Sequence, residues 1–225
     1  MSEYQTKLHS VPSGGFLTDR DMDKKPILDV RELGIDFGGL TAVDGFNLMI
    51  GRNEITGLIG PNGAGKTTVF NLITGAIPAD GGSVRYKGNE LIGKRVVQTV
   101  SLGVARTFQD LKLFGEFTVL QNVMVALRGR HGETVTAGLT YSDRSAKAWA
   151  DIEKAQEILA LFGLSDAAET PVASLPYGMQ KLVSLARLYA VDAELLLLDE
   201  PTSGMDEDST TLFYRLLYQI NREQG

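Results

Sequence analysis

The residues between 60 and 68 combine glycines, a lysine and two hydroxyl groups at a spacing that can hold a phosphate. They read Gly-Pro-Asn-Gly-Ala-Gly-Lys-Thr-Thr and match the pattern G-x-x-x-x-G-K-[ST]. The glycines let the main chain approach an anion closely, Lys66 can reach the β- and γ-phosphates, and the Thr67 hydroxyl can bind Mg²⁺. We therefore predict that the chain binds ATP or GTP. The loop residues expected to contact the nucleotide are Gly60, Asn62, Gly63, Ala64, Gly65, Lys66, Thr67 and Thr68.

Two carboxylates follow a run of four leucines near residue 200. Leu195 to Leu198 predict a fully buried strand, and Asp199 and Glu200 stand at its carboxyl end. Acids in such a place need a cation or a proton-transfer task to offset their burial. We predict that Asp199 holds Mg²⁺, directly or through water, and that Glu200 polarises the attacking water. A strand end capped by solvated acids is the alternative, which the upstream glycine-rich loop disfavours.

The elements beside the glycine-rich loop suit this chemistry. Residues 54–59 predict a short buried strand, and residues 67–74 predict a helix that ends at Gly75. Such a unit would point the positive end of the helix dipole at the phosphates. Trp149, the only tryptophan, falls in a helical pattern, and its side chain is predicted to pack against other side chains of the fold. Further strands are predicted at 27–33, 46–50, 83–88 and 194–200, and further helices at 119–127, 145–162, 180–190 and 207–223.

Composition narrows the class of protein. With 225 residues, of which 43% are hydrophobic and 22% charged, the chain can bury the core of one domain or of one lobe with a subdomain. No apolar run approaches the roughly 18 residues of a membrane span, and without cysteine there is neither a disulfide nor a thiolate metal site. The net charge of −6 argues against nucleic acid as a partner. Any link to a membrane should therefore run through another protein.

Two further motifs complete a family pattern. Arg106-Thr107-Phe108-Gln109 stands between the loop and the acids, and residues 175–181 read Leu-Pro-Tyr-Gly-Met-Gln-Lys at the start of a helix. From about Pro26 onward, the chain resembles the nucleotide-binding subunit of an ABC transporter. The strings ARTFQ, FNLITG and LPYGMQKLVSLARLYA are most similar to importer ATPases for branched-chain amino acids and related polar substrates.

The resemblance implies an α/β fold with a P-loop NTPase core of mixed, mostly parallel sheet. A polar, flexible tail at 1–25 would precede one ATPase domain over residues 26–225. That domain would contain an N-terminal antiparallel β subdomain and an inserted α-helical signature subdomain at about 110–190. Two subunits, as a homo- or heterodimer, would enclose ATP and Mg²⁺ at their interface. Transmembrane permease subunits, and indirectly a periplasmic or extracellular binding protein, would be the other partners. The chain would lie at the cytoplasmic face of the inner membrane as a peripheral ATPase.

The resemblance also implies roles for single residues. Phe37 would stack on adenine, with packing in the core as the alternative, and Gln109 would bind Mg²⁺ and the attacking water. With Gln109, the catalytic residues would be Glu200 and Lys66. Asp206 would contact nucleotide from the loop that acts across the dimer. The signature residues expected to contact the γ-phosphate held by a second subunit are Pro176, Tyr177, Gly178 and Gln180. The residues that would either line a permease contact or pack in the core are Leu111, Leu113, Phe114 and Phe117.

Two features depart from the family pattern. Pro176 replaces the usual serine of the signature and has no donor, so the anion site there would rest on backbone N–H groups and the helix dipole. The family's histidine lies on a strand after the helix 207–223, and neither His9 nor His131 can replace it by position. We therefore expect the C-terminal part of the ABC fold to be missing from this chain, which would bind ATP and hydrolyse it poorly.

Other functions remain as alternatives to an importer ATPase. One is an ABC module that is hydrolysis-deficient or regulatory, and another is the ATPase of a lipid or urea/amide transporter. A non-transport ABC protein of DNA repair or translation is disfavoured by the negative charge and by the lack of a coiled-coil or metal-binding insertion. A small kinase or GTPase is also disfavoured, since an Asn-Lys-x-Asp motif is absent.

Overall fold

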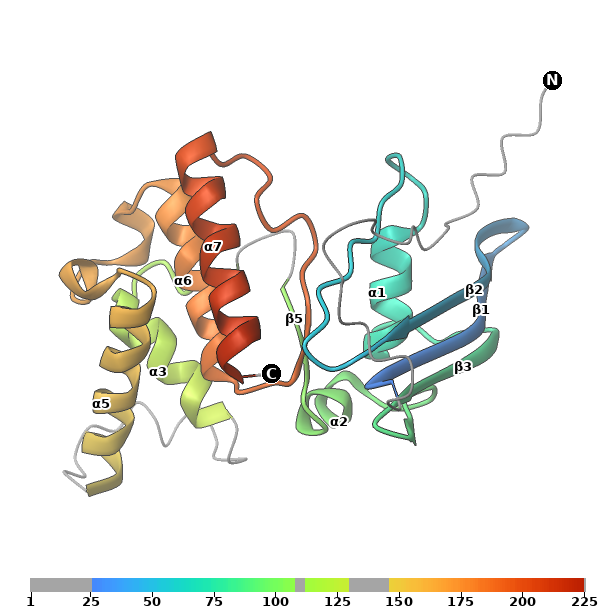
Figure 1. The fold of residues 1–225 in the computed structure, drawn as a ribbon, viewed down its shortest axis with the longest axis horizontal. Helices are drawn as coiled ribbons and strands as arrows, with labels where there is room; N and C mark the ends of the chain where they lie inside the picture. The colour runs from blue at the N-terminus through green and yellow to red at the C-terminus, as the bar shows by residue number, and fades with distance from the viewer. Residues whose placement is uncertain (1–25, 108–111, 130–145, 225) are drawn as a thin grey trace. The chain divides into compact units, whose positions relative to one another are not determined.

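The computed structural model describes residues 26–107, 112–129 and 146–224 (Figure 1). The chain divides into two compact units, one comprising Met1–Val100 with Ile220–Gly225 and the other Ser101–Gln219. The predicted tail at 1–25, together with His9, Gln109, Leu111 and His131, lies outside the described residues.

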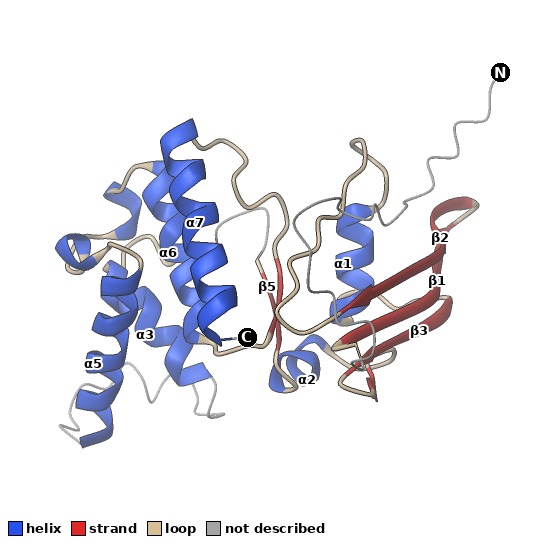
Figure 2. Cartoon of the chain, viewed as in Figure 1, coloured by secondary structure: helices blue, strands red, loops and turns tan. Residues whose placement is uncertain are grey.

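An antiparallel sheet of four strands lies in the first unit (Figure 2). β1 (Leu28–Phe37) pairs on one side with β2 (Leu40–Ile50) and on the other with β3 (Gly81–Tyr86), and β4 (Asn89–Glu90) continues the sheet beyond β3. Along β1, the buried side chains are Leu28, Val30, Leu33 and Ile35. The predicted N-terminal antiparallel β part is confirmed, and its two first strands are longer than the patterns at 27–33 and 46–50 indicate.

Helix α1 (Lys66–Thr74) follows the glycine-rich loop in the first unit. It begins one residue before the predicted start and ends as predicted at Gly75, whose φ is +72°. Val69, Leu72 and Ile73 are fully buried, so one face of the helix packs in the core of this unit. The short helix α2 (Val96–Ser101) comes later in the chain.

Residues 54–59 do not form the predicted strand. No described strand pairs with this segment, because β2 pairs with β1 and β5 with β6. Ile59, expected inside the core, is 72% exposed. A strand is stable only where a neighbouring backbone accepts and donates its hydrogen bonds, and a short apolar run does not reveal whether such a neighbour exists. The prediction of a buried strand is therefore wrong, while the loop and the helix after it are present.

Helices dominate the second unit. α3 (Val119–Gly129) packs against α5 (Ala146–Leu161) and α6 (Tyr177–Ala190), and the 3-10 turns η1 (Ser165–Ala167) and η2 (Val172–Ser174) lead from α5 to α6. Their shared core includes Val123, Leu159, Phe162 and Leu185, each at most 1% exposed. α6 begins three residues before the predicted start at 180, because Pro176 lies at its N-cap, where a missing N–H costs no helical hydrogen bond.

A short parallel ladder lies in the same unit. β5 (Val104–Arg106) pairs with β6 (Leu195–Leu197) so that Arg106 is opposite Leu197. No sequence pattern marks β5, because three residues are too few to show alternation. β6 is shorter than the predicted 194–200, and its side chains alternate, with Leu195, Leu197 and Asp199 buried and the leucines between them half-buried. Helix α7 (Glu207–Gln224) follows and matches its prediction.

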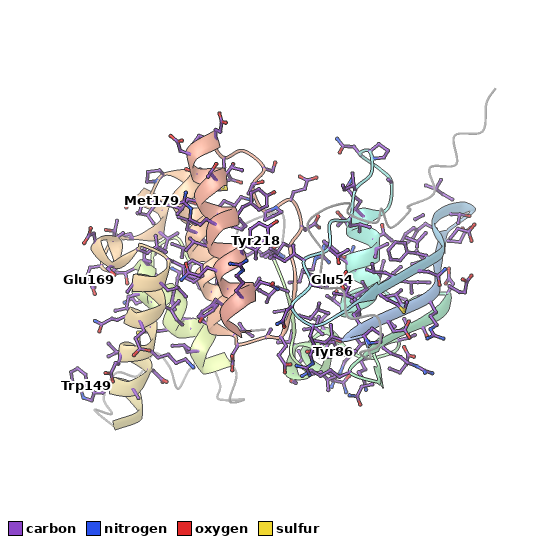
Figure 3. All side chains as sticks on the ribbon, viewed as in Figure 1. Glu54, Tyr86, Trp149, Glu169, Met179 and Tyr218 are labelled. Carbon is purple, nitrogen blue, oxygen red and sulfur yellow. The ribbon has the colours of Figure 1, made fainter. Side chains whose placement is uncertain are left out.

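Trp149 does not pack in the core. It lies on α5 with 63% of its side chain exposed, as Figure 3 shows near one end of that helix. A helical sequence pattern gives the spacing of a residue along the helix, but not whether another element covers that face. The packing role predicted for Trp149 is wrong.

Candidate functional site

The glycine-rich loop turns through left-handed backbone at two places in the first unit. Gly63 and Gly65 each have φ +82°, and the Ala64 N–H donates to the carbonyl of Pro61 at 3.2 Å. Gly65 is the N-cap of α1, and no side chain caps this helix. The first N–H groups of a helix have no partner within the helix, so an uncapped start beside a glycine loop can receive an anion.

Lys66 lies against the beginning of its own loop. Its Nζ donates to the carbonyl oxygens of Gly60 at 2.7 Å and Pro61 at 2.8 Å. Both acceptors are neutral, so the ammonium keeps its net charge beside the positive end of α1. Of the predicted loop contacts, the exposed ones are Asn62, Gly63 and Thr67, and the half-buried ones are Gly60, Ala64, Gly65, Lys66 and Thr68. The arrangement suits binding of a phosphate by both backbone and side chain.

Strand β2 passes close to the backbone of the glycine-rich loop at Gly65. A Cβ built on Gly65 would lie 2.5 Å from the carbonyl oxygen of Ala42 and 3.4 Å from Cγ2 of Val43. Only glycine fits this approach of two backbones. Phe37 pairs with Leu40 at the turn of the same β1–β2 hairpin, and Leu40 precedes Ala42 by two residues. The Phe37 side chain is 50% exposed. A packed core position, the alternative for Phe37, does not agree with this exposure.

Asp199 is buried in the second unit and is held by β5 and the residue after it. Its Oδ2 lies 2.9 Å from Nη2 of Arg106, and both side chains are 7% exposed. Its backbone N–H donates to Oγ1 of Thr107 at 3.1 Å, and the Thr107 N–H donates to the carbonyl of Leu197 at 2.9 Å. Sequence reasoning missed Arg106 as a partner, because the two charges are 93 residues apart and no local pattern links them.

Glu200 differs from its neighbour in both exposure and conformation. It is exposed, and its φ is +44°, a left-handed value that costs a non-glycine residue about 1–2 kcal/mol. The Ser203 N–H donates to the Glu200 carbonyl at 3.2 Å, which closes a turn at once. The two acids therefore have different environments, one buried beside a cation and one open to water.

The signature residues lie at the start of α6. Pro176 and Tyr177 are exposed, Gly178 and Gln180 are half-buried, and no side chain caps the helix. The Gln180 amide donates to the carbonyl of Leu175 at 2.9 Å, so this side chain holds its own loop. The N–H groups at the start of α6 remain suited to an anion.

Asp206 acts as the N-cap of α7. Its carboxylate accepts the Ser209 N–H at 2.8 Å and the Ser209 hydroxyl at 2.7 Å. These hydrogen bonds to the charged form lower the pKa of Asp206. Sequence reasoning missed this role, although an aspartate just before a predicted helix is a known capping signal.

The aromatic residues proposed for a permease contact lie in the loop before α3. Phe114 is 45% exposed and stacks on the half-buried Phe117, with ring centroids 5.2 Å apart. Asn122 is fully buried and fixes this loop by accepting the Phe114 N–H and donating to the Phe114 carbonyl, each at 3.0 Å. Leu113 is half-buried. Phe114 is thus an ordered, partly exposed ring rather than a core residue.

The available metal donors are hard oxygen atoms. Over the described ranges, no three His, Cys, Asp or Glu side chains gather as a metal-binding group. Mg²⁺ bound with a nucleotide takes only one or two protein oxygens besides the phosphates. The Thr67 hydroxyl of the first unit and the Asp199 carboxylate of the second are each an oxygen donor of the kind that this ion takes. Within those same ranges, no helix has the length and apolar character needed to cross a membrane.

Comparisons with known proteins give a consistent picture. Residues 43–203 match the family described as ABC transporter. The chain is 38% identical over 203 residues to the "High-affinity branched-chain amino acid transport ATP-binding protein LivG" of Escherichia coli (strain K12), an alignment that spans 89% of this chain and 79% of the relative. It is 34% identical over 201 residues to the "Methionine import ATP-binding protein MetN" of Rhizobium etli, across 88% of this chain and 51% of the relative.

A solved structure shares the fold. The ADP conformation of MJ1267, an ATP-binding cassette of an ABC transporter, superimposes with a TM-score of 0.78 at 27% identity, covering 89% of this chain and 79% of that one. This likeness confirms the predicted fold class.

Replacement of Gly65 by alanine should destabilise the protein more than the same change at Gly63. Both positions have φ +82°, so both pay the left-handed cost of about 1–2 kcal/mol. Only at Gly65 does the new methyl meet the Ala42 carbonyl, which adds about 1–3 kcal/mol. Chemical denaturation of the two variants measures the difference, and equal losses would contradict the close approach of β2.

Arg106→Met should lower the free energy of unfolding by about 3–5 kcal/mol, because it leaves the Asp199 carboxylate buried without its cation. The double variant Arg106→Met/Asp199→Leu should recover most of this loss, since both buried charges are then gone. Arg31→Met is the control: Arg31 lies 2.7 Å from Asp29 and its side chain is 68% exposed, whereas that of Asp29 is 17% exposed. Because water reaches this pair, the change should shift the denaturation midpoint much less than Arg106→Met does. Equal destabilisation of the single and double variants would show that the ion pair is not the cause.

Proposed function

This chain belongs to the ABC transporter ATPase family, and we propose that it couples ATP hydrolysis to the import of branched-chain amino acids. The observation that carries the nucleotide part is the glycine-rich loop, which combines an uncapped helix start with the Lys66 ammonium. The substrate part is supported by the 38% and 37% identity to LivG and to BraF of Pseudomonas aeruginosa, both named as branched-chain amino acid transport proteins. These matches do not favour a hydrolysis-deficient or regulatory module.

In this proposal, the residues of the first unit bind the nucleotide. The loop N–H groups and Lys66 hold the phosphates, and Phe37 offers an exposed ring to the adenine base. Thr67 provides a hydroxyl oxygen for Mg²⁺, and Asp199 of the second unit provides a carboxylate. When bound, the ion supplies positive charge to the β- and γ-phosphates. Gln109 keeps its proposed role at the ion and the water, and it lies outside the described residues.

Glu200 is the proposed general base. It is the exposed member of the acid pair, so a water molecule can reach its carboxylate. Asp199, whose charge is balanced by Arg106, is the less suitable base because its carboxylate already accepts a charged hydrogen bond. The left-handed backbone of Glu200 directs the chain into the turn that leads to Asp206, and such strain often accompanies a functional position.

A second copy of the chain, or a related subunit, completes the site in this proposal. The start of α6, at Pro176 to Gly178, offers backbone N–H groups and the positive end of a helix to the γ-phosphate held by the partner. ATP would favour the closed dimer because it contacts both copies, and hydrolysis would remove that contact. The dimer would act on permease subunits in a membrane, with the ring of Phe114 as part of the contact surface.

Glu200→Gln should lower ATP turnover by at least about 100-fold and leave the affinity for a non-hydrolysable ATP analogue nearly unchanged, because only proton abstraction is lost. Lys66→Ala should weaken analogue binding by about tenfold or more, since a charged contact to phosphate is lost. Glu207→Gln, an exposed acid in the first turn of α7, is the control and should retain turnover. Phosphate release and fluorescence titration measure the two quantities. Wild-type protein that takes up no ATP in the presence of magnesium would sink the proposal.

The substrate proposal has a separate test. The chain, co-purified with its permease subunits in vesicles, should hydrolyse ATP several-fold faster when a binding protein loaded with leucine is added than when the same protein is empty. Binding protein loaded with methionine is the comparison, because MetN is also a relative. Stimulation by methionine alone would overturn the proposal for branched-chain amino acids without affecting the ATPase assignment.

A further inference from the structure

The guanidinium of Arg106 contacts the carboxylate that the proposed function gives to magnesium. Nη2 of Arg106 lies 2.9 Å from Oδ2 of Asp199, and each side chain is 7% exposed. Both residues belong to the second unit, so the contact is made within one compact part of the chain. The family pattern assigns a role to Gln109 in the ARTFQ string, but none to the arginine that precedes it by three residues.

The parallel ladder explains why these two charges meet. Arg106 is opposite Leu197, and Asp199 follows Leu197 by two residues on the same buried face. The long arginine side chain therefore reaches forward along the ladder to the carboxylate. Thr107 adds two hydrogen bonds, one to the Leu197 carbonyl and one from the Asp199 N–H. Arg106 and Thr107 therefore contribute both to the position of Asp199 and to the balance of its charge.

A magnesium ion at this carboxylate would meet a positive charge that is already present. Opposite charges attract strongly where solvent is excluded, and for the same reason two cations that share one carboxylate repel each other with little screening. Binding of the ion and the Arg106–Asp199 contact must therefore weaken each other, and by linkage the effect is reciprocal.

We propose that Arg106 is a positioning residue that serves as the resident counter-ion of Asp199 and thereby limits how strongly magnesium enhances nucleotide binding. The inference rests on the proposed function, because it takes Asp199 as a magnesium residue. Arg106 keeps the carboxylate oriented and charge-balanced before nucleotide arrives. It also lowers the affinity for the ion, so that the metal is retained only together with the phosphates.

The test compares nucleotide affinity with and without the metal. A fluorescent, non-hydrolysable ATP analogue is titrated into wild-type protein, Arg106→Gln and Arg106→Lys, once in excess Mg²⁺ and once in EDTA. The ratio of the two dissociation constants is the enhancement by magnesium. Arg106→Gln should raise this ratio about tenfold, because the competing charge is gone, whereas Arg106→Lys keeps the charge and should stay within about twofold of wild type.

A purely structural role for Arg106 predicts a different result. It would lower stability in Arg106→Gln and leave the ratio unchanged, and this outcome, like a decreased ratio, would overturn the inference. In an Asp199→Asn background, the Arg106→Gln change should leave the ratio unaltered, because the shared carboxylate is absent. Wild-type protein that binds the analogue without any enhancement by magnesium would instead contradict the proposed function, and the inference would fall with it.

A measurement on wild-type protein covers the case in which Arg106→Gln does not fold. Arginine side-chain nitrogen NMR reports hindered rotation of a guanidinium in a buried ion pair, and Asp199→Asn identifies the Arg106 signal. Addition of Mg²⁺ with the analogue should speed this rotation, whereas the analogue in EDTA should not. An Arg106 signal that is unaffected by the metal would overturn the inference.

Discussion

The buried ion pair between Arg106 and Asp199 is the constraint on which the chemistry of the second unit depends. Two charges removed from water cost more than their attraction returns unless their geometry is good and other hydrogen bonds help. Here the parallel β5–β6 ladder sets the register, and Thr107 holds the backbone of Asp199. The result is a carboxylate with a defined position at the end of a very short sheet, followed at once by the exposed Glu200.

The first unit attracts charge through backbone groups and one lysine rather than through a buried ion pair. It has a glycine loop at a helix start, where partial charges of backbone groups and one ammonium attract an anion. This design needs no buried ion pair, but it needs close backbone approaches, and the carbonyl of Ala42 beside Gly65 shows how little space remains. Rigid backbone dipoles suit a ligand that arrives with several negative charges.

The start of α6 packs closely against the loop after Glu200 and against the start of α7 in the second unit. Gly178 lies against Ser209, since a Cβ built there would be 2.8 Å from the serine hydroxyl, and Gly204 lies against the ring of Tyr177. Asp206 caps α7 through the same serine. The start of α6 therefore contacts both the loop after Glu200 and the first turn of α7, and these contacts give the region around Pro176 a defined position.

The sequence by itself determined the glycine loop, the acid pair and the main helices. Each is a local feature, because a motif of nine residues or a period of 3.6 residues is complete within its own segment. Tertiary structure alone decided whether residues 54–59 have a strand partner, where β5 pairs, that Trp149 is exposed, and that Arg106 meets Asp199. The reason is physical. Strand pairing, burial and ion pairs depend on groups that are far apart along the chain, and a local pattern carries no record of what the fold brings beside it.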